Sequence, residues 1–100
     1  MRTIPLGKFD VPSDTVLKID KSIDCAFCIV ELDPFVGYDV PVFVCALVSD
    51  TPLTPQYVMD NGQTITPSTT IYCGNVNQLF LVAQAGGTPA VRVFAVVTGQ

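Results

Sequence analysis

Residues 78–98, QLFLVAQAGGTPAVRVFAVVT, consist of two runs rich in apolar and β-branched residues on either side of a Gly-Gly-Thr-Pro turn signal. Side chains alternate between the two faces of a strand, so each run can be divided by parity. Apolar residues fall on both faces of both runs, whereas a strand with one face in water shows apolar and polar residues in alternation. The stretch therefore predicts two strands that are apolar on both faces.

Similar runs recur about every ten residues between clusters of Pro, Gly, Asn and Asp, a pattern typical of an antiparallel sandwich or small barrel. No helix of three turns is predicted, although residues 16–23 would also suit a short helical turn. The predicted fold is all-β, a compact antiparallel β-sandwich of about eight short strands in one domain, residues 1–100, with a jelly roll as one arrangement that removes exposed sheet edges. The strands are predicted at residues 3–9, 15–19, 25–32, 40–49, 56–59, 69–73, 78–84 and 90–98.

Charged residues are scarce, at 14% of the chain against 49% hydrophobic residues, and the net charge is -4. The chain therefore lacks the basic surface that a nucleic-acid backbone requires. It also lacks an uninterrupted apolar run of about 18 residues, so no membrane-spanning helix is predicted. The first ten residues contain Pro5, Gly7 and Asp10 where a signal peptide needs a continuous apolar segment. Synthesis and folding in the cytoplasm, with reduced thiols, are expected.

The last two predicted strands carry the candidate interface. A three-residue loop between them would place Phe80 opposite Phe94 and Val82 opposite Arg92, and a two-residue loop would exchange the pairings. In either register an apolar patch remains outside a single core, and such patches with polar rims usually mark protein interfaces. The alternative is that the chain's own N-terminal segment or loops cover this face. The candidate interface residues are Phe80, Val82, Arg92, Phe94 and Val96.

The segment 23–32, IDCAFCIVEL, contains Cys25 and Cys28 in a Cys-x-x-Cys, a spacing that metal sites and redox enzymes both use. Residues three apart in a strand point to opposite faces, so these two thiols are not expected to share a metal ion. Cys45 and Cys73 stand alone, and the chain has no His to complete a zinc site. We expect four thiols that behave as small hydrophobic side chains, with no metal and no cofactor.

No catalytic arrangement is predicted. The absence of His excludes a Ser/His/Asp or Cys/His nucleophilic site. Two pairs of turn carboxylates, Asp20 with Asp24 and Asp33 with Asp39, could approach each other or bind calcium. Their spacing matches no calcium-loop motif, so solvated turn residues are the expected role.

Three tyrosines, Tyr38, Tyr57 and Tyr72, could line a sugar-binding surface. Since the chain has no Trp and no alternation of exposed aromatic residues, packing with a hydroxyl that reaches a partner is the ordinary interpretation. Gly86-Gly87 precedes a strand and not a helix, so it is expected to form a turn and not a phosphate-binding loop.

Two passages are the basis of a family resemblance: the turn-rich TITPSTTIYCGN at 64–75 and AVRVFAVVTGQ at 90–100. In size and style the chain resembles the small all-β accessory proteins of tailed-phage virions, especially capsid decoration or cement proteins. The resemblance implies a protein that binds the outer capsid at local symmetry axes, often as trimers, and stabilises the shell without a cofactor. The implied partners are copies of itself and a larger assembly such as a capsid shell, with no nucleic acid and no membrane.

Two other functions stay open. A head-to-tail or tail structural component of a virion would share every property described above. A free-standing carbohydrate- or receptor-binding sandwich would instead be monomeric, with exposed aromatic residues around a groove.

Overall fold

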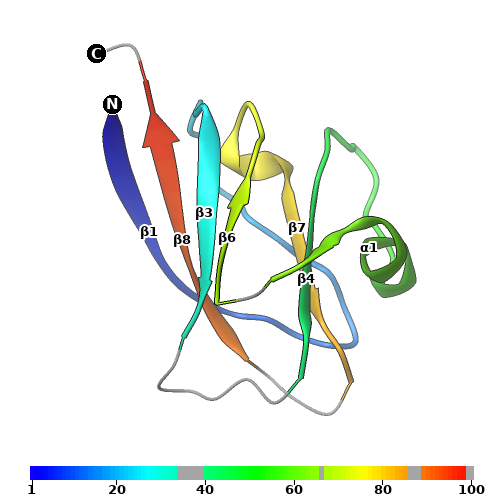
Figure 1. Cartoon of the computed structure of the whole chain (residues 1–100). Coiled ribbons are helices and arrows are strands. Elements are labelled where there is room, and N and C mark those ends of the chain that lie inside the picture. The colour runs from blue at the N-terminus through cyan, green and yellow to red at the C-terminus, as the bar shows by residue number, and fades with distance from the viewer. Residues whose placement is uncertain (34–39, 66, 86–88, 99–100) are drawn as a thin grey trace.

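The computed structural model describes residues 1–33, 40–65, 67–85 and 89–98 and contains two four-stranded antiparallel sheets that pack as a sandwich (Figure 1). The predicted all-β sandwich of eight short strands is confirmed. Sheet A contains, in spatial order, β1 (Arg2–Asp10), β8 (Ala90–Val97), β3 (Phe27–Leu32) and β6 (Ser68–Ile71). Sheet B contains β2 (Leu17–Lys18), β7 (Leu79–Ala83), β4 (Val42–Ala46) and β5 (Gln63–Thr64).

The strand order is that of a jelly roll. The first strand pairs with the eighth, the second with the seventh, the third with the sixth and the fourth with the fifth, all antiparallel. This nesting arises when one long antiparallel ribbon is folded over on itself, so that successive strands fall in different sheets. Among the strands of the described residues, only β4 and β5 are consecutive in the same sheet, and each other pair of consecutive strands is divided between the sheets.

The main core lies between the inner faces of the two sheets. Its side chains are mostly small and β-branched, which suits close packing of two pleated surfaces about 10 Å apart. Sheet A contributes buried residues that include Cys28, Val30, Val91, Val93 and Ala95. Sheet B contributes buried residues that include Val42, Val44, Leu79, Leu81 and Ala83.

The strand predicted at residues 56–59 is wrong, because this segment forms the helix α1 (Pro55–Asn61). Thr54 caps the helix, since its hydroxyl accepts a hydrogen bond from the backbone N–H of Tyr57 at 3.1 Å. Pro55 stands at the start of the first turn, where its fixed φ favours a helix and its missing N–H costs no hydrogen bond. These two residues at the N-terminus outweigh the β propensity of the residues that follow.

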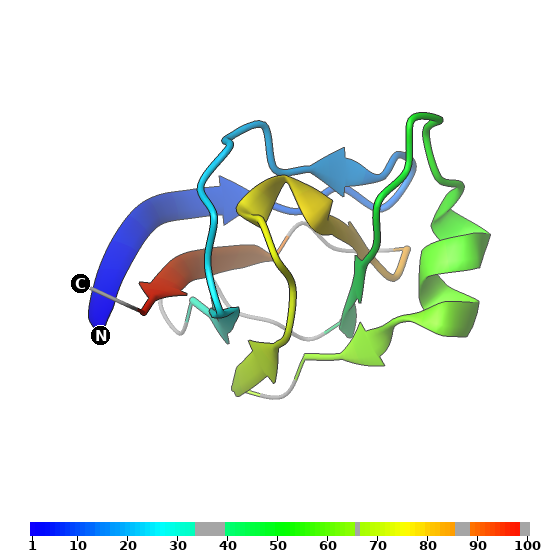
Figure 2. The ribbon, with the colours of Figure 1, turned by 90° about the horizontal axis from the view of Figure 1, so that it is seen from above.

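Helix α1 covers the outer face of sheet B (Figure 2). Buried Val58 packs there with Phe80 and Val82 of β7, and partly buried side chains on the same face, Phe43 and Cys45 of β4, join the cluster. Both faces of β4 and β7 are therefore apolar, and α1 lies over the outer one. The chain itself supplies the cover on this side.

The other helical segment is a single 3-10 turn, η1 (Val76–Gln78). Residues 16–23 contain the short strand β2 and no helical turn. Neither α1 nor η1, the helices of the described residues, approaches the length and apolarity that a membrane-crossing helix requires.

Candidate functional site

The five predicted interface residues do not share one surface. Strands β7 and β8 belong to different sheets, so both proposed registers, which paired Phe80 or Val82 with residues of β8, are wrong. Parity fixes which residues share a face but does not distinguish a hairpin from a crossing between sheets. Phe80 and Val82 are 2% and 0% exposed and lie beneath α1. They belong to the second apolar cluster and are not available to a partner.

The outer face of sheet A holds the remaining members of the predicted set. Phe94 of β8 lies beside Ile29 of β3, and Val96 of β8 lies beside Phe27 of β3. Val93 and Ala95, which alternate with Phe94 and Val96 along β8, point into the main core. The side chains of Phe94, Val96 and their two partners on β3 therefore point away from it. Phe27, Ile29 and Phe94 are half-buried, whereas Val96 is enclosed by its neighbours and is only 2% exposed.

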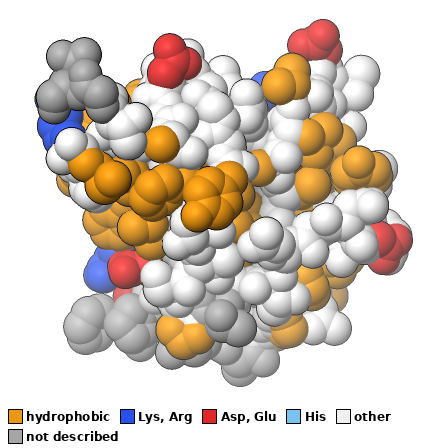
Figure 3. Space-filling model, turned by 45° about the horizontal axis from the view of Figure 1, so that its top comes forward, with side chains coloured by type: hydrophobic (Ala, Val, Ile, Leu, Met, Phe, Trp, Pro, Cys, Tyr) orange, Lys and Arg blue, Asp and Glu red, His pale blue; other side chains and the backbone are white. Residues whose placement is uncertain are grey.

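The apolar surface continues onto the neighbouring strands. Pro5 of β1 lies beside Phe94. Tyr72 directly follows β6, and the centroid of its ring lies 5.8 Å from the centroid of the Phe27 ring, at an interplanar angle of 55°. Tyr72 is 79% exposed. The left part of Figure 3 shows a band of hydrophobic side chains on the side of the molecule where sheet A lies in Figure 1. We call this surface the outer patch; its residues are Pro5, Phe27, Ile29, Tyr72, Phe94 and Val96.

Charged side chains border the outer patch at one end. Arg92 of β8 lies between Lys8 of β1 and Glu31 of β3. The carboxylate of Asp33, 2% exposed at the end of β3, lies 3.5 Å from Lys8 Nζ and 3.8 Å from the Arg92 guanidinium. Arg92 thus pairs with a buried acid of its own chain. The border of the patch carries charges of both signs.

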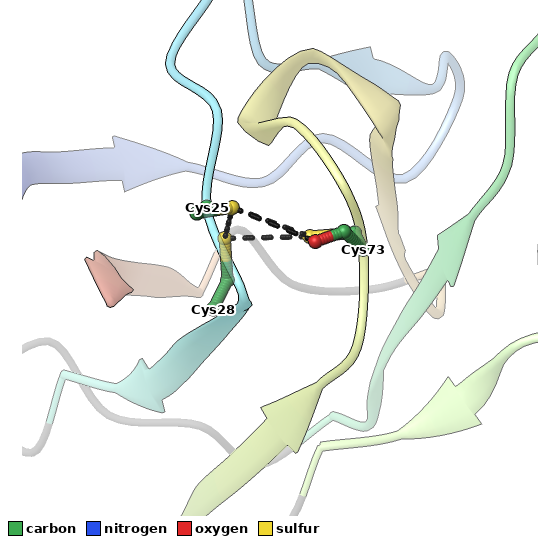
Figure 4. A group of neighbouring side chains, drawn as sticks. All are labelled: Cys25, Cys28 and Cys73. Carbon is green, nitrogen blue, oxygen red and sulfur yellow. Dashed lines mark hydrogen bonds between the residues drawn. The ribbon is translucent and has the colours of Figure 1, made fainter. Parts of the chain in front are cut away.

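The thiols of Cys25 and Cys28 do not face opposite ways, so that prediction is wrong. Strand β3 begins at Phe27, and Cys25 precedes it, so strand alternation does not govern its direction. The two Sγ atoms lie 3.7 Å apart. Cys73, which follows β6, places its Sγ 3.5 Å from that of Cys28 and 3.9 Å from that of Cys25 (Figure 4). We call these three residues the thiol cluster.

The three thiols of the cluster influence one another's ionisation. The pKa of Cys73 is lowered to about 7, because the thiol of Cys28 donates a hydrogen bond to the Cys73 thiolate once it forms. The pKa of Cys28 is raised, first by that same hydrogen bond and then by burial. Burial also raises the pKa of Cys25. Cys73 is therefore the first of the three to become a thiolate.

Within the described residues, the thiol cluster is the only set of three or more His, Cys, Asp or Glu side chains whose ligand atoms all lie within 4.8 Å of one another. Cys45 lies apart from it, on the outer face of sheet B. Asp24 accepts a hydrogen bond from Asn75 Nδ2 at 3.0 Å, and Asp33 forms the ion pairs described above. Asp39 lies outside the described residues.

The two tyrosines in the described part of the chain, Tyr57 and Tyr72, do not share a surface. Tyr57 belongs to α1 over sheet B, whereas Tyr72 belongs to the outer patch on sheet A. Tyr38 and the pair Gly86-Gly87 lie outside the described residues. A hollow of about 490 Å³ lies between the approach to β2 and the loop before α1. Its aromatic wall is Phe80, which is almost fully buried.

Comparisons with protein-family models, with curated proteins and with solved structures give no match to this chain. The surfaces of the chain itself are therefore the guide to its function.

Proposed function

We propose that this chain is a non-enzymatic structural protein that assembles through the outer patch, and that it is a virion component of the capsid decoration or cement type. The outer patch carries the proposal. It is an apolar surface that is continuous across sheet A, centred on Phe94 and bordered at one end by charges. Apolar patches with polar rims are typical of protein interfaces.

Copies of the same chain are the first partner that we propose, followed by the shell of a capsid. Arg92 and Glu31 are neighbours at the border of the patch. A border with both signs of charge can meet itself across a symmetry axis, so that each positive group faces a negative one. The apolar centre then supplies the binding free energy, and the charges set the orientation.

Strand-edge contacts contribute less than the sheet face in this proposal. β1 is a nine-residue edge strand of sheet A, and an exposed edge can pair with another chain. However, Pro5 has no N–H to donate, and the register shifts between Pro5 and Gly7, whose φ is +101°. A bulge with a proline interrupts the edge that a partner strand would need. The side chains of the outer patch are the main contact.

The jelly-roll order is compatible with this function, since viral capsid proteins and lectins both use that fold. Fold alone does not separate the two functions. The hollow beside Phe80 offers no exposed aromatic ring for a sugar to stack on. That hollow therefore gives carbohydrate binding no support, and the exposed ring of Tyr72 belongs to the outer patch. A head-to-tail or tail component of a virion would fit the outer patch equally well. Locating the chain in a virus particle would distinguish such a component from a decoration protein.

The variant Phe94→Asp tests the proposal. A charge at the centre of an apolar interface is expected to weaken self-association by about 30-fold or more, because central interface residues contribute about 2 kcal/mol or more. Since Phe94 lies outside both apolar clusters, the variant should keep its β-sheet circular dichroism spectrum. Association is measured by sedimentation velocity over a range of concentrations.

Two matched variants control this experiment. Val48→Asp places the same charge at a residue that is 78% exposed and outside the outer patch, and it should associate normally. Phe80→Asp buries the charge under α1 and should unfold the protein. If Phe94→Asp associates as strongly as Val48→Asp, the outer patch is not the interface.

A further inference from the structure

We propose that the thiol cluster is a metal site, in which Cys25, Cys28 and Cys73 hold one zinc ion as thiolates. The site is independent of the outer patch and of the assembly proposed above. It joins Cys25, which precedes β3, and Cys28 of β3 to Cys73, which follows β6 (Figure 4).

The distances between the sulfur atoms are those that zinc requires. The three Sγ–Sγ separations are 3.5, 3.7 and 3.9 Å. A Zn–S bond is about 2.3 Å long, so sulfur atoms at the corners of a tetrahedral zinc site lie roughly 3.8 Å apart. A zinc ion could therefore bind with small movements of the three side chains. Soft thiolate ligands select zinc or copper(I) over hard cations such as magnesium and calcium.

The backbone holds the two segments in place without help from a metal. Asp24 and Asn75 form an isolated antiparallel bridge. The Cys25 N–H donates to the Gly74 carbonyl at 3.1 Å, and the Val76 N–H donates to the Ile23 carbonyl at 3.0 Å. The segments that carry the three cysteines are thus fixed before metal binds, which reduces the conformational entropy lost when zinc binds.

The Asn75 side chain strengthens this connection. Its Oδ1 accepts a hydrogen bond from the Ile23 N–H at 3.2 Å, and its Nδ2 donates to Asp24 Oδ1 at 3.0 Å. The carboxylate beside the cluster is therefore oriented by an amide of the opposite segment. This arrangement keeps the two metal-binding segments in register.

The thiol cluster is most accessible at Cys25. Cys28 and Cys73 are buried, whereas Cys25 is half-buried and borders a hollow with Asp24, Ala26, Val97 and Thr98. Zinc with three protein ligands takes water or an external ligand in its fourth position. A fourth ligand that enters beside Cys25 would complete the tetrahedral geometry of zinc, whereas we expect three thiolates to suffice for copper(I).

The experiment is zinc titration of the whole chain, purified under reducing conditions. We expect about one tightly held zinc per chain and, with cobalt(II) in its place, thiolate-to-cobalt charge-transfer absorption. At free zinc about 100 times the dissociation constant, Tm should rise by on the order of 10 °C. Cys28→Ser and Cys73→Ser should lose the bound metal. Cys45→Ser, which changes the one cysteine outside the cluster, should retain it.

Of the three cluster variants, Cys25→Ser is expected to disturb folding least, because Cys25 is half-buried and lies outside the strands. It should keep the wild-type circular dichroism spectrum and bind zinc at least about 10-fold more weakly, as expected for the loss of a ligand. Three results would overturn the proposal: equal zinc content in Cys25→Ser and Cys45→Ser, binding of copper(I) without binding of zinc, or a Cys28–Cys73 disulfide in a protein that binds no zinc when reduced.

Discussion

Gly62 occupies a position where no side chain fits. A Cβ added there would lie 2.5 Å from the Val44 carbonyl oxygen and 2.6 Å from the Val58 carbonyl oxygen. Both are backbone atoms, of β4 and α1, and cannot rotate away. The missing side chain allows α1 to end closely against β4 before β5 begins, where the Gly62 N–H donates to the Val58 carbonyl at 2.8 Å.

Gly62→Ala is therefore expected to lower the free energy of unfolding by about 1–3 kcal/mol, the usual cost of forcing a methyl group into a filled space. Urea denaturation measures the change. Gly74→Ala is the matched control, because the nearest atom to its added Cβ, on the Gln78 side chain, is 3.8 Å away. An equal loss of stability in both variants would contradict this account of Gly62.

The thiol cluster marks the limit of sequence analysis at the scale of single residues. Alternation along a strand predicted that Cys25 and Cys28 diverge, but the strand begins at Phe27, and a boundary error of two residues reverses the conclusion. Cys73 joins the cluster through the bridge between Asp24 and Asn75. Contacts between segments so far apart in the chain leave no local pattern. The local signals were the Cys-x-x-Cys spacing of Cys25 and Cys28 and the Gly74-Asn75 pair directly after Cys73.

Helix α1 shows how end signals decide the state of a short segment. Tyr57, Val58 and Met59 favour a strand by composition, and the sequence predicted one. The preceding Thr54-Pro55 and the following Gly62 are helix boundary signals that could have corrected this prediction. Because α1 covers Phe80 and Val82, the same error left these two buried residues in the predicted interface.

The cap of α1 gives a prediction at the scale of elements. Thr54→Ala removes the oxygen that accepts the Tyr57 N–H, so the free energy of unfolding should fall by about 1 kcal/mol. Thr54→Ser keeps the hydroxyl and should stay within a few tenths of a kcal/mol of the wild type. Thermal unfolding followed by circular dichroism measures both. If serine and alanine destabilise the protein equally, the hydrogen bond to Tyr57 is not what stabilises α1.

Sequence parity correctly predicted that β7 is apolar on both faces, because that property depends only on which residues alternate. It could not predict which strands are neighbours. The order β1-β8-β3-β6 depends on where the chain crosses between the sheets. The crossing after β7 separates Phe80 from Phe94, although the sequence alone favoured a hairpin there.

For the whole molecule, the regular spacing of β-prone runs was enough to predict an all-β sandwich. The scarcity of charge, 14% of residues, agrees with a chain that fills two apolar clusters and still exposes the outer patch. Which apolar residues remain outside the core followed only from the structure. It confirms that Phe94, Val96 and Arg92 lie on one face of sheet A and adds Phe27, Ile29 and Tyr72 to that face.

The most direct test of the proposed function is the mass of the wild-type chain in solution, measured by sedimentation equilibrium under reducing conditions over a wide concentration range. The outer patch predicts a reversible increase to a defined multiple of the single-chain mass as the concentration rises. A chain that remains monomeric at every concentration would contradict self-association through this surface.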